Sequence, residues 1–134
     1  MIDFTALTKA VASLAQALEM TRLRADDLDL LARDGCIQRF EYTYELCVKS
    51  MRRQLDAMAD SAISVDELGF KDMVRMAAER GLIADPQAWF AFRELRNITV
   101  HTYDQDKAQT VFAALPSFLK HAQQLDKLLR KSAA

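Results

Sequence analysis

One stretch, residues 37–58, constrains the fold more than any other part of this 134-residue chain. Its apolar residues recur every three or four positions over about six helical turns. They are Ile37, Phe40, Tyr44, Cys47, Met51, Leu55 and Met58. Leu46 and Val48 widen this stripe, so the helix must contact more than one neighbour. We predict the central helix of a bundle, with part of the stripe forming a homodimer surface. The alternative is that one monomeric bundle covers the whole stripe.

The first third of the chain is also helical in pattern. Residues 3–19 carry apolar side chains in steps of three and four, and Asp3 can cap that helix. The polar residues 21–27 predict a connection, and the second helix is expected to start between residues 27 and 34. Only three Gly and two Pro occur, which favours long uninterrupted elements.

Capping signals mark the middle helices. Ser64 and Glu67 have the spacing of a capping box, which predicts the start of a third helix. Gly81 is expected to end that helix in a left-handed conformation. Asp85 followed by Pro86 predicts the start of a fourth helix, with the carboxylate as cap and the proline at the first helical position.

The last helix is expected to start after Asp104 and to run to about Lys131. Pro116 lies inside it and should kink it, because proline donates no backbone hydrogen bond. His121 is expected to be exposed and not catalytic. Together these patterns predict an all-α fold, a four- to five-helix antiparallel bundle that forms a single domain over residues 1–134.

Composition excludes several classes of function. The formal net charge is −1 and the pI is about 6.1, so an RNA partner would have to be attracted by a local patch of the surface. No apolar run approaches the ~20 residues of a membrane span. The N-terminus lacks a basic region followed by an apolar stretch, so we expect no signal peptide and a cytoplasmic location.

The two cysteines and the carboxylates of the chain suggest no metal centre. Cys36 and Cys47 do not have the spacing of a zinc site with the two histidines, and we expect both to be core residues, with no metal and no cofactor in the protein. Glu41 and Glu45 lie one turn apart on a helix and therefore share a face. Paired carboxylates can do acid–base work, but here we expect them to orient a neighbouring arginine or to face solvent.

The densest polar chemistry lies in residues 96–103. Arg96 is a permanent cation that can bind a phosphate with a planar set of donors. The His101 side chain can exchange a proton near neutral pH, and Tyr103 offers a phenolic hydroxyl. Asn97 shares a helical face with His101, so it could orient the imidazole or a phosphate.

The geometry of this motif depends on where the fourth helix ends. Arg96 and His101 are five residues apart, about 140° around a regular helix, and would not share a face. Residues 98–100 are β-branched, which lowers helix propensity. We therefore expect the helix to loosen between residues 99 and 102 and His101 to move toward Arg96. The alternative is that both side chains only stabilise the helix end.

The pattern Arg96–x4–His101–x–Tyr103, together with residues 37–46, resembles the HEPN superfamily. More narrowly, the chain is similar to the HepT-type toxins, also described as substrate-binding subunits of nucleotidyltransferases. The resemblance covers nearly the whole chain and implies a four-helix core.

The resemblance implies two alternative functions, and the residues alone do not decide between them. In the first, the protein is a metal-independent ribonuclease toxin, with Arg96 and His101 catalytic at a homodimer cleft. A separate nucleotidyltransferase antitoxin would then silence it by transferring AMP to Tyr103. In the second, the protein is a non-catalytic subunit that binds substrate for a separate nucleotidyltransferase.

Overall fold

The computed structural model describes residues 2–22, 30–59 and 65–133. These ranges contain five α-helices, two short 3-10 helices and no β-strand, which confirms the predicted all-α class. In chain order the elements are α1 (Thr5–Arg22), α2 (Leu30–Met58), η1 (Val65–Glu67), α3 (Phe70–Glu79), α4 (Pro86–Ile98), η2 (Thr99–His101) and α5 (Gln105–Ala133).

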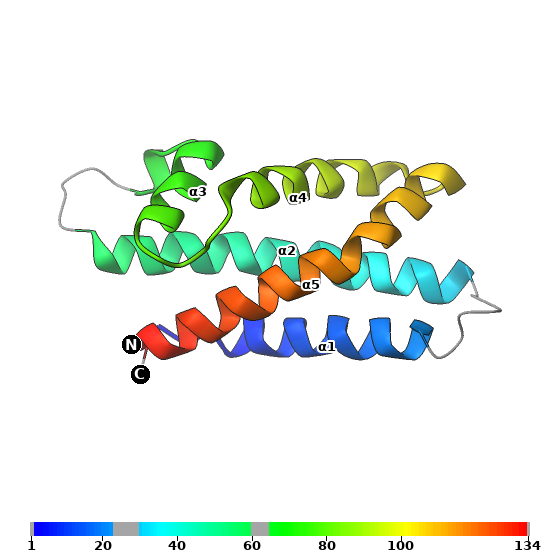
Figure 1. Cartoon of the computed structure of the whole chain (residues 1–134), viewed down its shortest axis with the longest axis horizontal. Helices are drawn as coiled ribbons and strands as arrows, with labels where there is room; N and C mark the ends of the chain where they lie inside the picture. Colours follow the sequence, from blue (N-terminus) through cyan, green and yellow to red (C-terminus); the bar gives the residue numbers. More distant parts are fainter. Residues whose placement is uncertain (1, 23–29, 60–64, 134) are drawn as a thin grey trace.

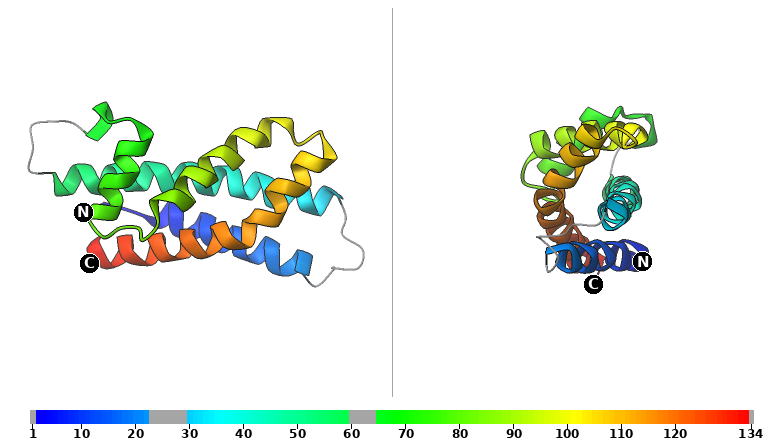
Figure 2. Two further views of the ribbon diagram at one scale, coloured as in Figure 1. Left: turned by 45° about the horizontal axis from the view of Figure 1, so that its top comes forward. Right: turned by 90° about the vertical axis from the view of Figure 1, so that its right-hand side faces the viewer.

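Helix α2 lies in the middle of the bundle and contacts α1, α3, α4 and α5. The long helices α1, α2, α4 and α5 run in alternating directions, and both chain termini lie at the same end of the molecule (Figure 1). Helix α5 contains Pro116, and it changes direction as it passes from the α4 side of the bundle to α1 (Figure 2). The predicted antiparallel bundle and the central position of α2 are therefore confirmed.

The apolar stripe of α2 is covered by helices of the same chain. Each of its first six residues is at most 5% exposed: Ile37, Phe40, Tyr44, Cys47, Met51 and Leu55. These six residues are therefore not available for a homodimer surface, because the bundle already buries them. Leu46 and Val48, which widen the stripe, are only partly buried, so the prediction that part of the stripe forms a homodimer surface stays a prediction.

An aromatic cluster fixes α4 against α2 and α5. The ring of Phe118 in α5 packs edge-on against Phe40 at 4.8 Å and against Phe92 at 5.1 Å between ring centroids. Trp89 contacts Phe92 at 5.3 Å and is only 1% exposed. Trp89 is thus a core anchor, and the cluster positions the helix that carries the polar motif.

The predicted capping signals explain three of the helix ends. The Asp85 carboxylate accepts hydrogen bonds from the backbone N–H groups of Gln87 and Ala88 at 3.0 and 3.3 Å, with Pro86 at the start of α4. The Asp104 carboxylate likewise accepts from the N–H groups two and three residues further on, at 2.9 and 3.2 Å. Gly81 follows α3 with a φ of 79°, the left-handed conformation that ends a helix.

Two expectations about this part of the fold were wrong. Helix α3 starts at Phe70 after Gly69, which offers no side-chain cap, rather than at a capping box. Ser64 lies outside the described residues, and Val65–Glu67 instead forms a 3-10 turn closed by the Leu68 N–H on the Val65 carbonyl at 3.0 Å.

His121 is half-buried rather than exposed, because its ring packs against Phe92 at 5.2 Å.

Candidate functional site

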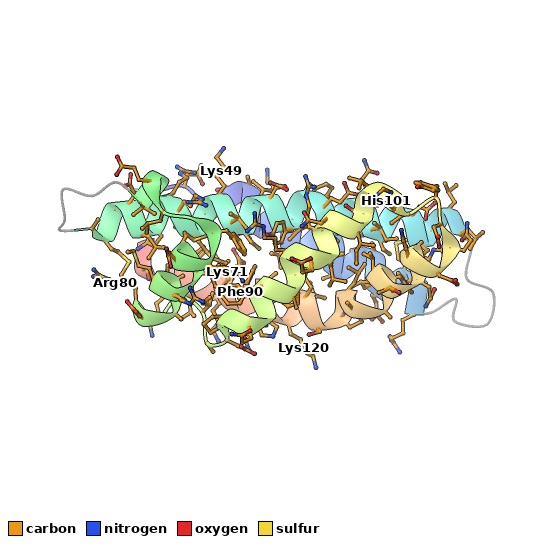
Figure 3. All side chains as sticks on the ribbon, turned by 90° about the horizontal axis from the view of Figure 1, so that it is seen from above. Lys49, Lys71, Arg80, Phe90, His101 and Lys120 are labelled. Atoms are coloured by element: carbon orange, nitrogen blue, oxygen red, sulfur yellow. The ribbon has the colours of Figure 1, made fainter. Side chains whose placement is uncertain are left out.

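The polar motif lies where α4 gives way to the 3-10 helix η2. Threonine hydroxyls support this change, because the Thr99 hydroxyl donates to the Arg96 carbonyl at 2.6 Å and the Thr102 hydroxyl to the Thr99 carbonyl at 3.1 Å. Such local bonds compete with regular helical bonds, and β-branched residues disfavour the α-helix. The expected loosening between residues 99 and 102 is therefore confirmed. It leaves His101 exposed at the far end of α4 (Figure 3).

Arg96 is held by one carboxylate of α2. Its Nε donates to Glu45 Oε1 at 2.8 Å, with 37% of the Arg96 side chain and 57% of the Glu45 side chain exposed. Burial raises the pKa of Glu41, while the nearby positive charge of Arg96 opposes the rise and the negative charge of Glu45 adds to it. The expectation that this carboxylate pair orients a neighbouring arginine is confirmed for Glu45.

His101 is paired with Tyr103. The His101 Nδ1 atom lies 3.2 Å from the Tyr103 hydroxyl oxygen, and the two rings meet nearly at right angles with centroids 5.8 Å apart. Tyr103 is 79% exposed. A hydrogen bond at one ring nitrogen determines which nitrogen carries the proton, so this contact leaves Nε2 as the atom that can face a substrate.

Within one chain the motif residues form two separate pairs. Arg96 bonds Glu45 and His101 bonds Tyr103, and no hydrogen bond joins Arg96 to His101 in the part of the chain that the structure describes. The Asn97 side chain is exposed, and none of the hydrogen bonds among the described residues involves it. All four predicted residues thus lie at one end of α4, but within one chain the arginine and the imidazole are held by different partners.

Sequence reasoning missed one buried cation beside this site. Arg33 of α2 is 5% exposed, and its guanidinium donates to the Gln105 side-chain oxygen at the start of α5. Its Nε has no hydrogen-bond partner among the described residues, although the Asp34 carboxylate lies 3.8 Å away. The signal was its position: Arg33 precedes Ile37 of the apolar stripe by four residues, so it shares the buried face of α2.

The rest of the described chain offers little other chemistry. No group of three or more His, Cys, Asp or Glu side chains within the described ranges is placed to hold a metal ion. Cys36 and Cys47 are free and buried, as expected, and burial raises the pKa of both thiols. No helix in these ranges is both long and apolar enough to cross a membrane.

Comparison with known proteins places this site in a family. Residues 2–131 match the family model described as "Nucleotidyltransferase substrate binding protein like". A Haemophilus influenzae protein named "Probable ribonuclease HepT" is 46% identical over 97 residues, which is 72% of this chain and 66% of that protein. The aligned part is thus just under two thirds of that relative's length.

Two solved structures share the fold. A Haemophilus influenzae protein, described as revealing the fold of a substrate binding domain of a nucleotidyltransferase, superposes with a TM-score of 0.89 at 39% identity. That match covers 96% of this chain and 99% of the other. A Thermus thermophilus protein superposes with a TM-score of 0.72 at 31% identity, over 90% of this chain and 98% of the other. The chain therefore belongs to the HEPN-like family of nucleotidyltransferase substrate-binding proteins, as the Arg96–His101–Tyr103 motif indicated.

Proposed function

We propose that this protein is a metal-independent ribonuclease of the HepT type, the toxin of a two-gene pair with a nucleotidyltransferase antitoxin. The observation that carries the proposal is the accessible cation and imidazole at the end of α4, with the imidazole held by Tyr103. The relative named "Probable ribonuclease HepT" supports the same chemistry.

In the proposed reaction His101 acts as a general base. Its Nε2 takes the proton of an RNA 2′-hydroxyl, whose oxygen attacks the adjacent phosphorus as the bond to the 5′-oxygen breaks. The departing 5′-oxygen takes a proton from solvent water, so a 2′,3′-cyclic phosphate and a 5′-hydroxyl result. Because DNA lacks the 2′-hydroxyl, the substrate is RNA.

Arg96 stabilises the negative charge that builds on the phosphorane oxygens in this reaction. Glu45 now occupies the Nε donor of Arg96, at 2.8 Å. The remaining guanidinium donors bind the phosphate, because arginine presents five N–H groups in one plane. Asn97 adds an exposed amide beside the same phosphate.

A homodimer completes the proposed active site. Arg96 and His101 have separate partners in one chain. A second copy of the chain therefore brings the arginines and imidazoles of two motifs together in one cleft. Since six residues of the α2 stripe are used in the core, the dimer uses apolar side chains that remain exposed. Val100 is 64% exposed and lies between Arg96 and His101 in the sequence.

The proposed control is transfer of AMP to Tyr103. The phenolic oxygen attacks the α-phosphorus of ATP, a new oxygen–phosphorus bond forms and pyrophosphate leaves. An exposed phenol is accessible to the partner enzyme, and the product adds negative charge and bulk close to Arg96. It also changes the oxygen that His101 Nδ1 contacts.

A second candidate function is a non-catalytic subunit that presents substrate to a separate nucleotidyltransferase. The structural relative described as a substrate binding domain of a nucleotidyltransferase favours it, as does the net charge of −1, which gives no long-range attraction for RNA. In this case Arg96 and His101 would be dispensable.

RNA cleavage by the purified protein and two variants separates the candidates. We expect Arg96→Ala and His101→Ala to abolish cleavage while circular dichroism and size-exclusion elution stay unchanged, because both side chains lie at the surface. Lys120→Ala, an exposed lysine on α5, is the control and should cleave normally. Cleavage retained in both variants, or unfolding of both, would refute the ribonuclease assignment.

Intact mass tests the proposed modification. Protein produced together with the neighbouring nucleotidyltransferase should gain about 329 Da per AMP, since a phenolic oxygen is a competent acceptor. The Tyr103→Phe variant should gain none. An unchanged mass, with a stable complex of the two proteins, would favour the binding-subunit function.

A further inference from the structure

Basic side chains lie over two aromatic rings on the face formed by α3 and α4. The Arg93 Cζ atom lies 4.6 Å from the Phe70 ring centroid, and Lys71 Nζ and Arg75 Cζ each lie 5.5 Å from the Phe90 centroid. The two rings are themselves 6.4 Å apart. We call Lys71, Arg75 and Arg93 the basic strip. Figure 3 views this face, with Lys71 and Phe90 side by side and His101 further along α4.

The aromatic rings hold these cations without using their hydrogen-bond donors. A cation over a ring face is attracted by the ring quadrupole, so the N–H groups of a stacked guanidinium still point outward in its plane. Arg75 has a carboxylate partner, Asp72, at 3.5 Å. Neither Lys71 nor Arg93 forms an ion pair with any described residue. The strip therefore presents ordered positive charge with free donors.

The basic strip continues into the polar motif. Arg93 precedes Arg96 by three residues and Asn97 by four, so these side chains are neighbours on the surface of α4. Both guanidiniums also lie near Tyr44 of α2: burial raises the pKa of that phenol, and the charges of Arg93 and Arg96 oppose the rise. From Phe90 to Arg96 the helix advances roughly 9 Å.

We propose that the basic strip binds the phosphates of single-stranded RNA on one side of the bond that is cleaved, and so supplies the local attraction that a net charge of −1 does not. This inference rests on the proposed ribonuclease function. The charge complements a polyanion, and Arg93 lies one helical turn from Arg96 on α4. Flexible single strands bind to positively charged surfaces mainly through their backbone, with strong salt dependence.

Binding measured without cleavage tests the strip. The full-length His101→Ala protein is titrated into a fluorescein-labelled pool of random 12-nucleotide RNA at several salt concentrations. Adding Lys71→Gln should weaken binding about fivefold at 0.1 M salt and lower the slope of log K against log salt by about 0.7, the loss of one phosphate contact on a single strand. Arg93→Gln should do the same.

Matched controls separate the strip from general charge. Lys120→Gln on α5 and Arg80→Gln after α3 remove the same charges from exposed positions and should leave the affinity within about 1.5-fold. Equal losses in strip and control variants, or no loss in any of them, would overturn the inference. So would an absence of RNA binding by the His101→Ala protein at 50 mM salt.

Failure of the strip and failure of the ribonuclease function give different results. If the wild-type protein cleaves RNA but Lys71→Gln binds RNA as Lys120→Gln does, only the strip is wrong. If the wild-type protein cleaves no RNA but the strip variants selectively lose binding, the strip stands and the protein binds RNA without cutting it. A strip variant that loses only the nucleotidyltransferase partner would show that the face binds protein instead, and would overturn the inference.

Discussion

Replacing Tyr103 with phenylalanine removes one hydroxyl from the centre of the proposed site. The lost contact is the 3.2 Å hydrogen bond between the Tyr103 oxygen and His101 Nδ1. When His101 acts as a base through Nε2, Nδ1 carries a proton and donates a hydrogen bond to the phenolic oxygen of Tyr103. In that tautomer the bond holds the ring in one orientation, with Nε2 free to act as the base.

The size of the effect follows from the exposure of the pair. An intramolecular hydrogen bond contributes about 0.5–1.5 kcal/mol, and the lower half of that range applies here because Tyr103 is 79% exposed and water competes for it. A difference of about 0.5–1 kcal/mol corresponds to a two- to fivefold loss of kcat/KM. We expect this loss to lie in kcat, since the phenol is not needed to hold a phosphate.

The assay is single-turnover cleavage of a labelled RNA as a function of pH, with Tyr42→Phe as the matched control. Tyr42 also loses a phenolic hydrogen bond, to the Ser13 hydroxyl at 2.7 Å, but on the α1–α2 side. The Tyr42→Phe variant should cleave RNA like the wild type. The reasoning is refuted if Tyr103→Phe cleaves at the wild-type rate over the whole pH range, or if Tyr42→Phe loses as much activity.

Three further predictions concern stability and reactivity. Phe118→Ala should lower the free energy of unfolding by about 3–5 kcal/mol in urea titrations, because its buried ring joins α2, α4 and α5, whereas Phe112→Ala, partly buried on the same helix, should cost less. Gly81→Ala should cost about 1 kcal/mol by the same assay, since a side chain is strained at a φ of 79°; an unchanged midpoint would show that the turn adjusts. Burial raises the pKa of the Cys47 thiol, so its alkylation should stay slow in the native protein as the pH rises from about 7 to 9 and become fast in urea. Rapid native alkylation at the higher pH would contradict the buried position.

Much of the fold could be predicted because its signals are local. The spacing of apolar residues in residues 37–58 depends only on the helical period, and α2 follows it. The caps at Asp85 and Asp104 satisfy backbone groups two or three residues away, so the sequence carries both partners. The start of α3 was missed because a capping box competes with a 3-10 turn, and that choice depends on what the turn packs against.

The candidate site was only partly predictable for the same physical reason. Arg96, His101 and Tyr103 are within eight residues, so their chemistry and the loosening of the helix could be inferred from the sequence. The partner of Arg96 could not be identified that way, because Glu45 lies on another helix and is 51 residues away in sequence. His121 was misplaced because its exposure depends on the aromatic cluster of α4 and α5.

The sequence by itself determined the helices, most of their ends and the residue types of the motif, since these depend on interactions between near neighbours in the chain. Only the tertiary structure decided which surfaces remain free. Packing buried six residues of the α2 stripe within one chain, gave Arg96 a carboxylate partner and brought Lys71 of α3 over the Phe90 ring of α4. Those outcomes depend on helices that meet across long sequence separations, where no local pattern specifies the partner.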